Sequence, residues 1–200
     1  MNKNLIIIGA SGQGFVVANL AELLGYSVIF WDDDITKKFS DYKVVKRKKS
    51  IPDNSSIIIG IGNNKIRKNI SLQYSIHSYI TLIHPNSNIS KKSKIGIGSV
   101  VISGVVINNG TIIGDHCIIN TGAVIDHDCV LNDFVHISPN ATLCGNVSIG
   151  AGSWVGAGAV IIQGINIGKN VIIGAGSVII SDIPNNVTVV GNPGRIIKYN

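Results

Sequence analysis

In this 200-residue chain, one group that could carry chemistry is a histidine flanked by carboxylates. His127 stands between Asp126 and Asp128, and His136 follows in the same segment. An imidazole titrates near neutral pH, so it can take the proton from an amine as that amine attacks an acyl group. A neighbouring carboxylate, Asp128 or Asp126, would hold the ring and raise its basicity. The sequence therefore predicts a general base at His127.

A glycine-rich loop near the N-terminus is the second such group. The loop Gly9–Gly14 reads G-x-x-G-x-G between a predicted strand, 4–8, and a predicted helix, 15–24. Glycines let a backbone approach a phosphate, and a helix N-terminus contributes amide donors and a partial positive charge. Asp32 and Asp33 follow about 20 residues later, where a Rossmann-type site binds a sugar hydroxyl. The pattern favours a bound nucleotide, and the alternative is that the glycines serve only strand-to-helix packing.

Alternating strands and helices surround the loop and must position it. The pattern adds three further strands at 27–31, 56–59 and 79–82. It also adds a second glycine turn at 60–64 and a second helix at 65–74. The lysine-rich segment 35–53 carries little periodic signal. This order implies a small parallel sheet with right-handed crossovers, an α/β Rossmann-like βαβ domain over residues 1–82. So small a domain holds one mononucleotide-binding half, which favours a single nucleotide or nucleotide sugar over NAD.

A period of six residues organises the rest of the chain. Every sixth residue from Ile83 to Ile179 is a branched aliphatic, the fourth residue after it is mostly small, and glycine often follows it directly. Such a period fits neither a helix nor an ordinary strand, and it indicates a parallel β-helix in which each hexad forms one strand and one corner. Three hexads make a triangular coil, so these seventeen hexads predict between five and six coils. The segment Val189–Arg195 leaves the register and is expected to cap the coil.

The hexad pattern resembles the left-handed β-helix acyltransferases of the hexapeptide-repeat family. Joined to the glycine-loop domain, it resembles one branch of that family, the bacterial acetyltransferases that act on nucleotide-linked 4-amino sugars in the bacillosamine and perosamine pathways. Sialic acid O-acetyltransferases are related to this branch. The resemblance covers essentially the entire chain and implies a left-handed β-helix acetyltransferase domain over residues 83–200.

The resemblance also implies roles for matching residues. His127 corresponds to the catalytic base, Asp128 to the acidic residue that raises its basicity, and His136 to the histidine that meets the thioester region of acetyl-CoA. Further acetyl-CoA positions are Asn120, Gly145, Ala157 and Ala175, and the nucleotide-sugar contacts are Ser11, Gly12, Gln13, Asp32, Asp33 and Gly62. Many relatives have histidine where Gln13 stands. Glutamine can hydrogen-bond a sugar or a phosphate but cannot titrate, which leaves the sugar open.

These roles lead to a specific expectation. The chain is expected to be an acetyl-CoA-dependent N-acetyltransferase that acts on the 4-amino group of a UDP- or dTDP-linked amino-deoxy sugar by direct attack on the thioester. The resemblance further implies a homotrimer with active-site grooves shared between neighbours. A sialic-acid-type sugar O-acetyltransferase would use the same coil and base, and a non-catalytic nucleotide-binding trimer would tolerate the loss of His127.

The composition of the chain limits the partners and the cellular compartment that can be expected. The net charge of +6 suits anionic ligands such as nucleotides and coenzyme A, and the basic residues lack the interleaved aromatics that bind single-stranded nucleic acid. The longest apolar runs fall far short of the about 20 residues that span a bilayer. The apolar stretch Leu5–Ile8 is too short for a signal peptide, so a cytoplasmic protein is expected. Three cysteines, an odd number, argue against a disulfide framework.

Three histidines of the coil raise the possibility of a zinc site. Some left-handed β-helix trimers are zinc carbonic anhydrases with three histidine ligands, and His116, His127 and His136 lie in the coil here. With three hexads to a coil, these spacings place the three side chains on different faces of one chain. They also do not match the closely spaced histidine pair of that family. We therefore expect no metal.

Overall fold

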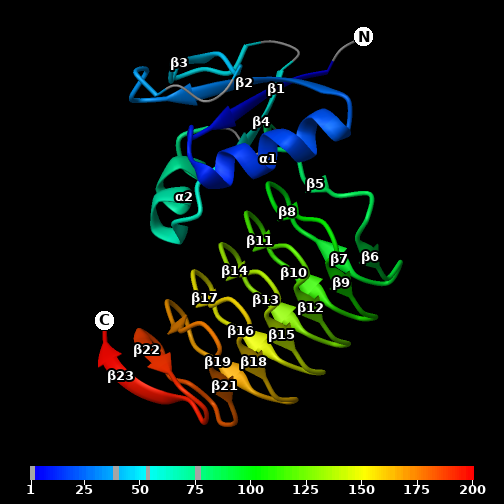
Figure 1. The fold of residues 1–200 in the computed structure, drawn as a ribbon, viewed down its shortest axis with the longest axis vertical. Helices are drawn as coiled ribbons and strands as arrows, with labels where there is room; N and C mark the ends of the chain where they lie inside the picture. The colour runs from blue at the N-terminus through cyan, green and yellow to red at the C-terminus, as the bar shows by residue number, and fades with distance from the viewer. Residues whose placement is uncertain (1–2, 38–40, 53–54, 75–77) are drawn as a thin grey trace. The chain divides into compact units, whose positions relative to one another are not determined.

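The computed structural model describes residues 3–37, 41–52, 55–74 and 78–200 of the chain. It divides into two compact units, Met1–Leu82 and Ile83–Asn200, each with its own core (Figure 1). The first unit is an open sheet with helices and the second is a coil of short strands, so the two are described separately.

The first unit contains a four-stranded parallel sheet. Its strands are β1 (Lys3–Ile8), β2 (Tyr26–Asp32), β3 (Val44–Lys46) and β4 (Ser55–Ile59), in the order β3-β2-β1-β4. Leu5, Ile6, Ile7 and Ile8 on the central strand are all buried, as expected for a parallel strand covered on both faces. Strand β3 is an edge strand of three residues inside the segment 35–53, too short to leave a periodic signal in the sequence.

Two helices follow β1 and β4. Helix α1 (Gly12–Leu23) begins three residues before the predicted start because the Ser11 side chain accepts a hydrogen bond from the Gly14 amide and caps it. Helix α2 (Asn64–Ser71) is capped in the same way by Asn63, which accepts from the Ile66 amide. The end of the glycine loop is therefore the first turn of α1, and its open amides lie at the carboxyl edge of the sheet.

The second unit is a parallel β-helix, as the six-residue period predicts. Each of seventeen hexads contributes one two-residue strand. They are β5 (Leu82–Ile83), β6 (Asn88–Ile89), β7 (Lys94–Ile95), β8 (Val100–Val101), β9 (Val106–Ile107), β10 (Ile112–Ile113), β11 (Ile118–Ile119), β12 (Val124–Ile125), β13 (Val130–Leu131), β14 (His136–Ile137), β15 (Thr142–Leu143), β16 (Ser148–Ile149), β17 (Trp154–Val155), β18 (Val160–Ile161), β19 (Asn166–Ile167), β20 (Ile172–Ile173) and β21 (Val178–Ile179).

Every third strand pairs in parallel, which gives the coil three faces. One sheet contains β8, β11, β14, β17 and β20, a second contains β9, β12, β15, β18 and β21, and a third contains β7, β10, β13, β16 and β19. From Val101 to Ile179 the aliphatic residue that ends each strand is buried in one continuous core. Burial of such a side chain contributes about 1.5–3 kcal/mol, so the repeat alone stabilises the coil.

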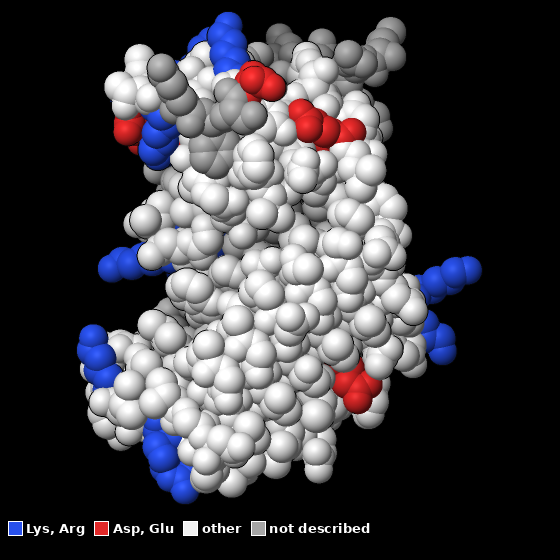
Figure 2. All heavy atoms as spheres, viewed as in Figure 1, with Lys and Arg blue, Asp and Glu red and all other residues white. Residues whose placement is uncertain are grey.

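The coil ends in a hairpin. Strand β22 (Val187–Val190) pairs in parallel with β20 and extends that face, and β23 (Arg195–Tyr199) pairs with β22 in the antiparallel direction. The six-residue register stops here. In Figure 2, the face of the coil turned to the viewer is mostly uncharged, with the visible Lys and Arg side chains at its margins.

Candidate active site

His127 and Asp128 form a pair at the corner that follows strand β12. The Nδ1 atom of His127 lies 2.9 Å from Oδ2 of Asp128. Asp128 has φ = 57°, the left-handed conformation that aspartate tolerates better than most residues. Asp126 is used differently, because its Oδ1 accepts the His127 backbone amide and the Asn108 side-chain amide, both at 2.8 Å. Of the two carboxylates proposed from the sequence, Asp128 is the one that holds the ring.

The electrostatics of this corner favour a basic imidazole. The hydrogen bond to Asp128 raises the pKa of His127 above its usual value, and the charge of Asp126 raises it further. The hydrogen bond from Asn108 in turn lowers the pKa of Asp126, which therefore remains ionised at neutral pH. Because Nδ1 is bonded to a carboxylate, the neutral ring keeps its proton there and has its lone pair on Nε2. More than half of the His127 side chain is exposed, so the pair can meet a substrate.

Gly145 lies directly against the His127 ring. It follows strand β15 on the next coil, and a Cβ atom at this position would overlap Nε2 and Cε1 of His127. Its φ angle is not in the left-handed region, so proximity to the ring and not backbone conformation explains the glycine. The resemblance assigns Gly145 to acetyl-CoA, and the structure places it beside His127.

His136 occupies another face of the coil. It lies on β14, is buried, and stacks on Trp154 of β17 with a centroid distance of 5.1 Å and an interplanar angle of 6°. Trp154 donates a 2.7 Å hydrogen bond from Nε1 to Oγ of Ser138, which fixes the indole. The Nδ2 atom of Asn120 approaches Nε2 of His136 at 3.5 Å. Trp154 was missed from the sequence, although it stands one coil after His136 at the same hexad position.

Ala157 and Ala175 complete this second group. They lie on successive coils at the exposed corners that follow β17 and β20, and the amide of Gly176 donates to the Ala157 carbonyl. The candidate residues of the coil thus form two groups. One group lies on one sheet and the corner that follows it, and comprises Asn120, His136, Ala157 and Ala175. The other lies at a different corner, and comprises His127, Asp128 and Gly145. Within the described residues of one chain, no hydrogen bond joins the two groups.

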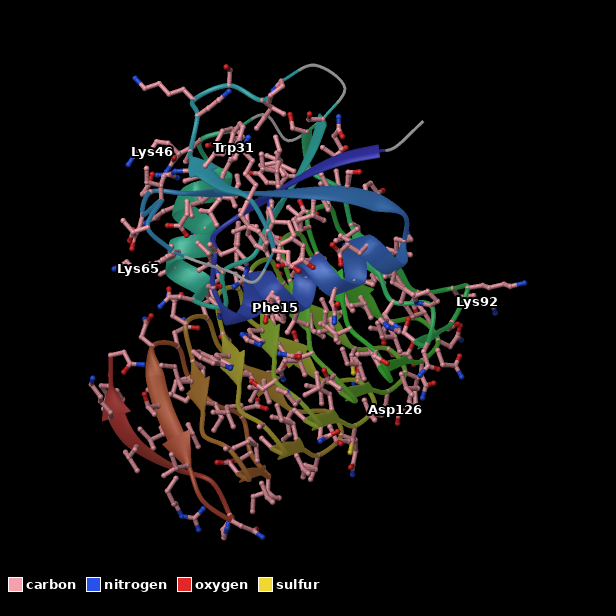
Figure 3. The ribbon with its side chains drawn as sticks, turned by 45° about the horizontal axis from the view of Figure 1, so that its top comes forward. Phe15, Trp31, Lys46, Lys65, Lys92 and Asp126 are labelled. Atoms are coloured by element: carbon pink, nitrogen blue, oxygen red, sulfur yellow. The ribbon has the colours of Figure 1, made fainter. Side chains whose placement is uncertain are left out.

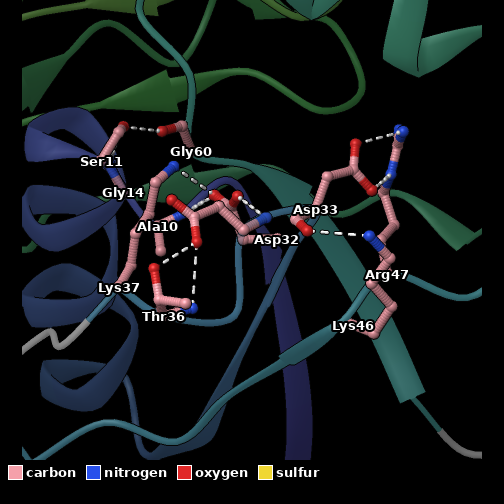
Figure 4. Close-up of polar contacts among 11 residues, drawn as sticks. Ala10, Ser11, Gly14, Asp32, Asp33, Thr36, Lys37, Lys46, Arg47 and Gly60 are labelled. Atoms are coloured by element: carbon pink, nitrogen blue, oxygen red, sulfur yellow. Dashed lines mark hydrogen bonds and ion pairs between the residues drawn. The ribbon is translucent and has the colours of Figure 1, made fainter.

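The glycine loop, the second glycine turn and the aspartates meet at the carboxyl edge of the parallel sheet. Ser11 donates from Oγ to the Gly60 carbonyl at 2.7 Å, and the Ala10 amide donates to Oδ2 of Asp32 at 2.8 Å (Figure 4). The ends of β1, β2 and β4 are thereby linked. This edge is where ligands bind in open α/β sheets.

Both aspartates of this edge are paired with cations. Asp32 accepts from Lys37 at 3.0 Å and from the Asp34 amide at 2.9 Å, and Asp33 receives two hydrogen bonds from Arg47 at 3.2 and 2.8 Å. Burial alone would raise the pKa of Asp32, but the bonds from Asp34, Lys37 and Ala10 outweigh it and hold that pKa below its usual value.

Lys46 also belongs to this cationic group. Its ammonium donates to the backbone carbonyl of Asp33 at 2.8 Å, and Figure 3 shows the side chain at the rim of the unit. Sequence reasoning counted Lys37, Lys46 and Arg47 only toward the overall charge. The signal that could have found them is their position on the segment that follows the aspartates.

The glycines of the two turns divide by function. A Cβ atom on Gly9, Gly14 or Gly60 would overlap neighbouring backbone or side-chain atoms, so these glycines are needed for packing. Gly12 has open space around it, and the nearest atom to a Cβ on Gly62 would be Gln13 Cβ at 4.0 Å. The packing explanation therefore accounts for only part of the pattern.

Gln13 presents an unsatisfied donor beside Gly62. Its Nε2 atom is buried, and none of the described residues places an acceptor within hydrogen-bond distance of it. An unpaired buried amide is costly, so a ligand oxygen at this position would be stabilising. The described residues bring Ser11, Gly12, Gln13, Asp32 and Gly62 to one edge of the sheet, and Asp33 lies beside them on the Arg47 side.

The described residues contain no cluster of three His, Cys, Asp or Glu side chains suited to a metal ion. His116 instead stacks on Phe134 at a centroid distance of 5.2 Å. No helix in the described ranges has the length and apolar content needed to cross a membrane. The three cysteines are free thiols, and Cys117 and Cys129 are buried in the coil core.

The fold and the comparisons with known proteins define a class, the hexapeptide-repeat acetyltransferases. Residues 4–74 match the family described as the PglD N-terminal domain, and residues 146–181 match the bacterial transferase hexapeptide (six repeats). The GDP-perosamine N-acetyltransferase of Escherichia coli O157:H7 is 34% identical over 184 aligned residues, and the match covers 86% of this chain and 83% of that protein. The chain belongs to the bacterial acetyltransferases that join a PglD-type N-terminal domain to a hexapeptide coil.

Other relatives and solved structures agree. The UDP-N-acetylbacillosamine N-acetyltransferase of Bacillus subtilis (strain 168) is 41% identical over 113 residues, 50% of this chain and 52% of that protein. The acetyltransferase domain of PglB from Neisseria gonorrhoeae FA1090, which has also been solved with acetyl coenzyme A, has a TM-score of 0.91 and 39% identity over 98% of this chain and 100% of that one. PerB from Caulobacter crescentus, solved with CoA and GDP-perosamine, has a TM-score of 0.90 and 34% identity over 98% and 97%. This protein is therefore an acetyltransferase.

Proposed function

We propose that this chain transfers the acetyl group of acetyl-CoA to the 4-amino group of a nucleotide-linked amino-deoxy sugar. The observation that carries the proposal is the His127–Asp128 pair, with its 2.9 Å hydrogen bond and accessible ring, in a chain whose relatives are named as amino-sugar N-acetyltransferases. An amine nucleophile needs a base near neutral pH, and this pair supplies one.

One base is enough to move the proton in the proposed reaction. The amine attacks the thioester carbonyl carbon, and Nε2 of His127 accepts the amine proton as the C–N bond forms. The tetrahedral intermediate collapses, the C–S bond breaks, and the CoA thiolate takes the proton back from the imidazolium. Asp128 keeps the ring oriented and stabilises its charged form through Nδ1. A base of this kind contributes about 10²–10⁴-fold to the rate.

We propose a homotrimer on the basis of the two separate groups in the coil. His127, Asp128 and Gly145 lie at one corner of the triangular section, while Asn120, His136, Ala157 and Ala175 lie along another face and its corner. A single acetyl-CoA can meet both groups only if neighbouring subunits supply them. The outward side chains of β9, β12, β18 and β21 are all valine and half-buried, which suits packing against another coil.

Mixed trimers test this arrangement. His127→Ala and Ala175→Trp are each expected to inactivate their own homotrimer, because one removes the base and the other fills the proposed coenzyme position. Co-refolding the two variants should restore part of the activity, since some interfaces then pair an intact His127 with an intact Ala175. Light scattering should give a molar mass three times that of one chain. A monomer, or mixed samples that stay inactive, would contradict the shared site.

We propose that the nucleotide sugar binds at the sheet edge formed by Ser11, Gly12, Gln13, Asp32, Asp33 and Gly62. The open space at Gly12 and Gly62, the buried donor of Gln13 and the nearby cations of Lys37, Lys46 and Arg47 support this assignment, because a nucleotide diphosphate is anionic and rich in acceptors. We propose UDP or dTDP as the carrier and the cytoplasm as the compartment, where nucleotide sugars and acetyl-CoA are available.

The decisive experiment is a thiol-release assay with acetyl-CoA. The acceptors are UDP-, dTDP- and GDP-linked 4-amino sugars, with the matching 4-hydroxy sugars as controls. Release that depends on the amino group, with an amide product stable to alkaline hydroxylamine, is the expected result. An ester product cleaved by hydroxylamine would instead identify an O-acetyltransferase. Nucleotide binding without thiol release for any acceptor would overturn the enzymatic proposal.

A further inference from the structure

Arg67 is a buried cation directly beneath the second glycine turn. It lies on helix α2, and only 1% of it is exposed. Its Nη1 atom donates to the carbonyl oxygens of Ile61 and Gly62, both at 3.0 Å, and its Nη2 atom donates to Oδ1 of Asn64 at 2.8 Å. A buried guanidinium is costly unless its donors are satisfied, and here the glycine turn itself satisfies several of them.

These bonds fix the direction of two peptide planes. In a trans peptide the carbonyl and the following amide point in opposite directions. Because the Ile61 and Gly62 carbonyls point toward Arg67, the amides of Gly62 and Asn63 point away from it. Neither amide donates a hydrogen bond to any of the described residues. Arg67 therefore holds two adjacent donors on the open side of the turn.

The open side of the turn is the edge already proposed to receive the nucleotide sugar. Gln13, with its unsatisfied buried Nε2, adjoins Gly62, and Ser11 binds the Gly60 carbonyl just before the turn. The amides of Gly62 and Asn63 and the side chain of Gln13 thus collect donors at one place. Acceptor oxygens are the ligand groups that would satisfy them.

We infer that Arg67 is a positioning residue of the nucleotide-sugar site. It acts through the turn, by holding the Gly62 and Asn63 amides toward the acceptor oxygens of the nucleotide sugar, and it does not itself touch substrate. The inference rests on the proposed function. Lysine cannot replace it fully, because an ammonium is a point charge without the planar fork that reaches two carbonyls and Asn64 together.

The test compares Arg67→Met, Arg67→Lys and the control Lys68→Met in the full-length chain. Lys68 lies on the same helix but is exposed, so its loss removes a positive charge without touching the turn through its side chain. For Arg67→Met we expect the KM for the nucleotide sugar to rise about tenfold, the equivalent of one or two hydrogen bonds. The KM for acetyl-CoA and the kcat should stay within about twofold, because a binding contact and not the chemistry is lost.

Arg67→Lys should give an intermediate rise, and Lys68→Met none. The lysine variant keeps the test decisive if the methionine variant does not fold, which thermal unfolding will show. An unchanged sugar KM in a folded Arg67 variant, or an equal loss in both KM values and kcat, would overturn the inference. Inactivity of the wild-type enzyme on every nucleotide sugar would instead refute the proposed function, so the two failures are distinguishable.

Discussion

The coil and the N-terminal sheet organise their candidate functional residues in opposite ways. In the coil, His127 bonds its immediate neighbour Asp128 and touches Gly145 one coil later, so its contacts follow from the repeat. In the sheet, Ala10 bonds Asp32 and Ser11 bonds Gly60, so its contacts join separate strands. A periodic unit fixes a side chain by its position in the repeat, whereas an open sheet fixes it by strand order.

This difference suggests a division of the reaction between the units. The coil holds the proposed base, His127, in an exposed position with few supporting contacts. The sheet edge holds a dense set of donors, carboxylates and cations. Substitutions in the coil corner should therefore reduce kcat, and substitutions at the sheet edge should raise the KM for the nucleotide sugar. Substitutions on either side can test that division.

The largest effect is expected for His127→Ala. Loss of the general base should lower kcat by about 10²–10⁴-fold, while the affinity for the nucleotide sugar stays unchanged. Steady-state kinetics and calorimetric titration with the nucleotide sugar measure the two quantities. His84→Gln, which alters another coil histidine whose Nδ1 accepts only a turn amide, is the matched control and should keep full activity. A weakened nucleotide affinity in His127→Ala would break the proposed division.

Gly145→Ala should have the next largest effect. The added Cβ overlaps the His127 ring and must displace it, and a displacement of about 1 Å can cost about 100-fold in rate. The loss should appear in kcat, and it should vanish when His127 is already alanine, which a double-mutant cycle shows. A rise in the KM for acetyl-CoA with unchanged kcat would mean that Gly145 serves the coenzyme alone.

Most of the fold could be predicted from the sequence because its signals are local. The six-residue period gave all seventeen coil strands, and each ends on the predicted aliphatic residue. The strand β3 and the early start of α1 were missed, because a three-residue edge strand has no period and the helix start depends on a serine cap inside the glycine loop.

The candidate site could be predicted only where it is local. The His127–Asp128 pair is formed by neighbours, so the sequence could propose it. The residue pattern left Asp128 and Asp126 open, the family resemblance favoured Asp128, and in the structure it is Asp128 that bonds the ring. The Arg47 partner of Asp33 and the stack of Trp154 on His136 depend on strand order and coil register, so neither was found. Tertiary pairing, not residue type, decides these contacts.

Asp32→Ala tests the sheet side of the comparison. The change removes the acceptor for the Ala10 amide and the Asp34 amide and also the partner of Lys37. The glycine loop therefore loses its side-chain tie to β2 and keeps the backbone bond from the Gly9 amide to the Trp31 carbonyl. We expect the KM for the nucleotide sugar to rise about thirtyfold, since bonds to a charged group contribute about 1.5–3 kcal/mol each. The kcat should change little. Asp34→Ala is the control, because it removes an exposed carboxylate outside the loop whose hydrogen bonds to the described residues go to Thr36.

Asp128→Asn should lower kcat less than the other two coil substitutions and should also change the pH dependence of the reaction. The hydrogen bond to Asp128 raises the pKa of His127, with a further contribution from the charge of Asp126. Only the neutral ring can act as a base, so wild-type activity should fall as the pH drops through this raised pKa. Asparagine removes the main cause, so the acidic limb should move to lower pH.

The plateau kcat of Asp128→Asn should fall about tenfold, because one charge-assisted hydrogen bond that orients the ring is lost. Measurement of kcat/KM from pH 5 to pH 9 separates the two effects. Asp126→Asn is the matched comparison. It removes a charge that also raises the pKa of His127, but it leaves the hydrogen bond between Asp128 and the ring intact. The acidic limb of its pH profile should therefore shift in the same direction, with a higher plateau than in Asp128→Asn. If the limb stays in place in Asp128→Asn, the titrating group is not His127, and the coil would no longer be the catalytic side of the comparison.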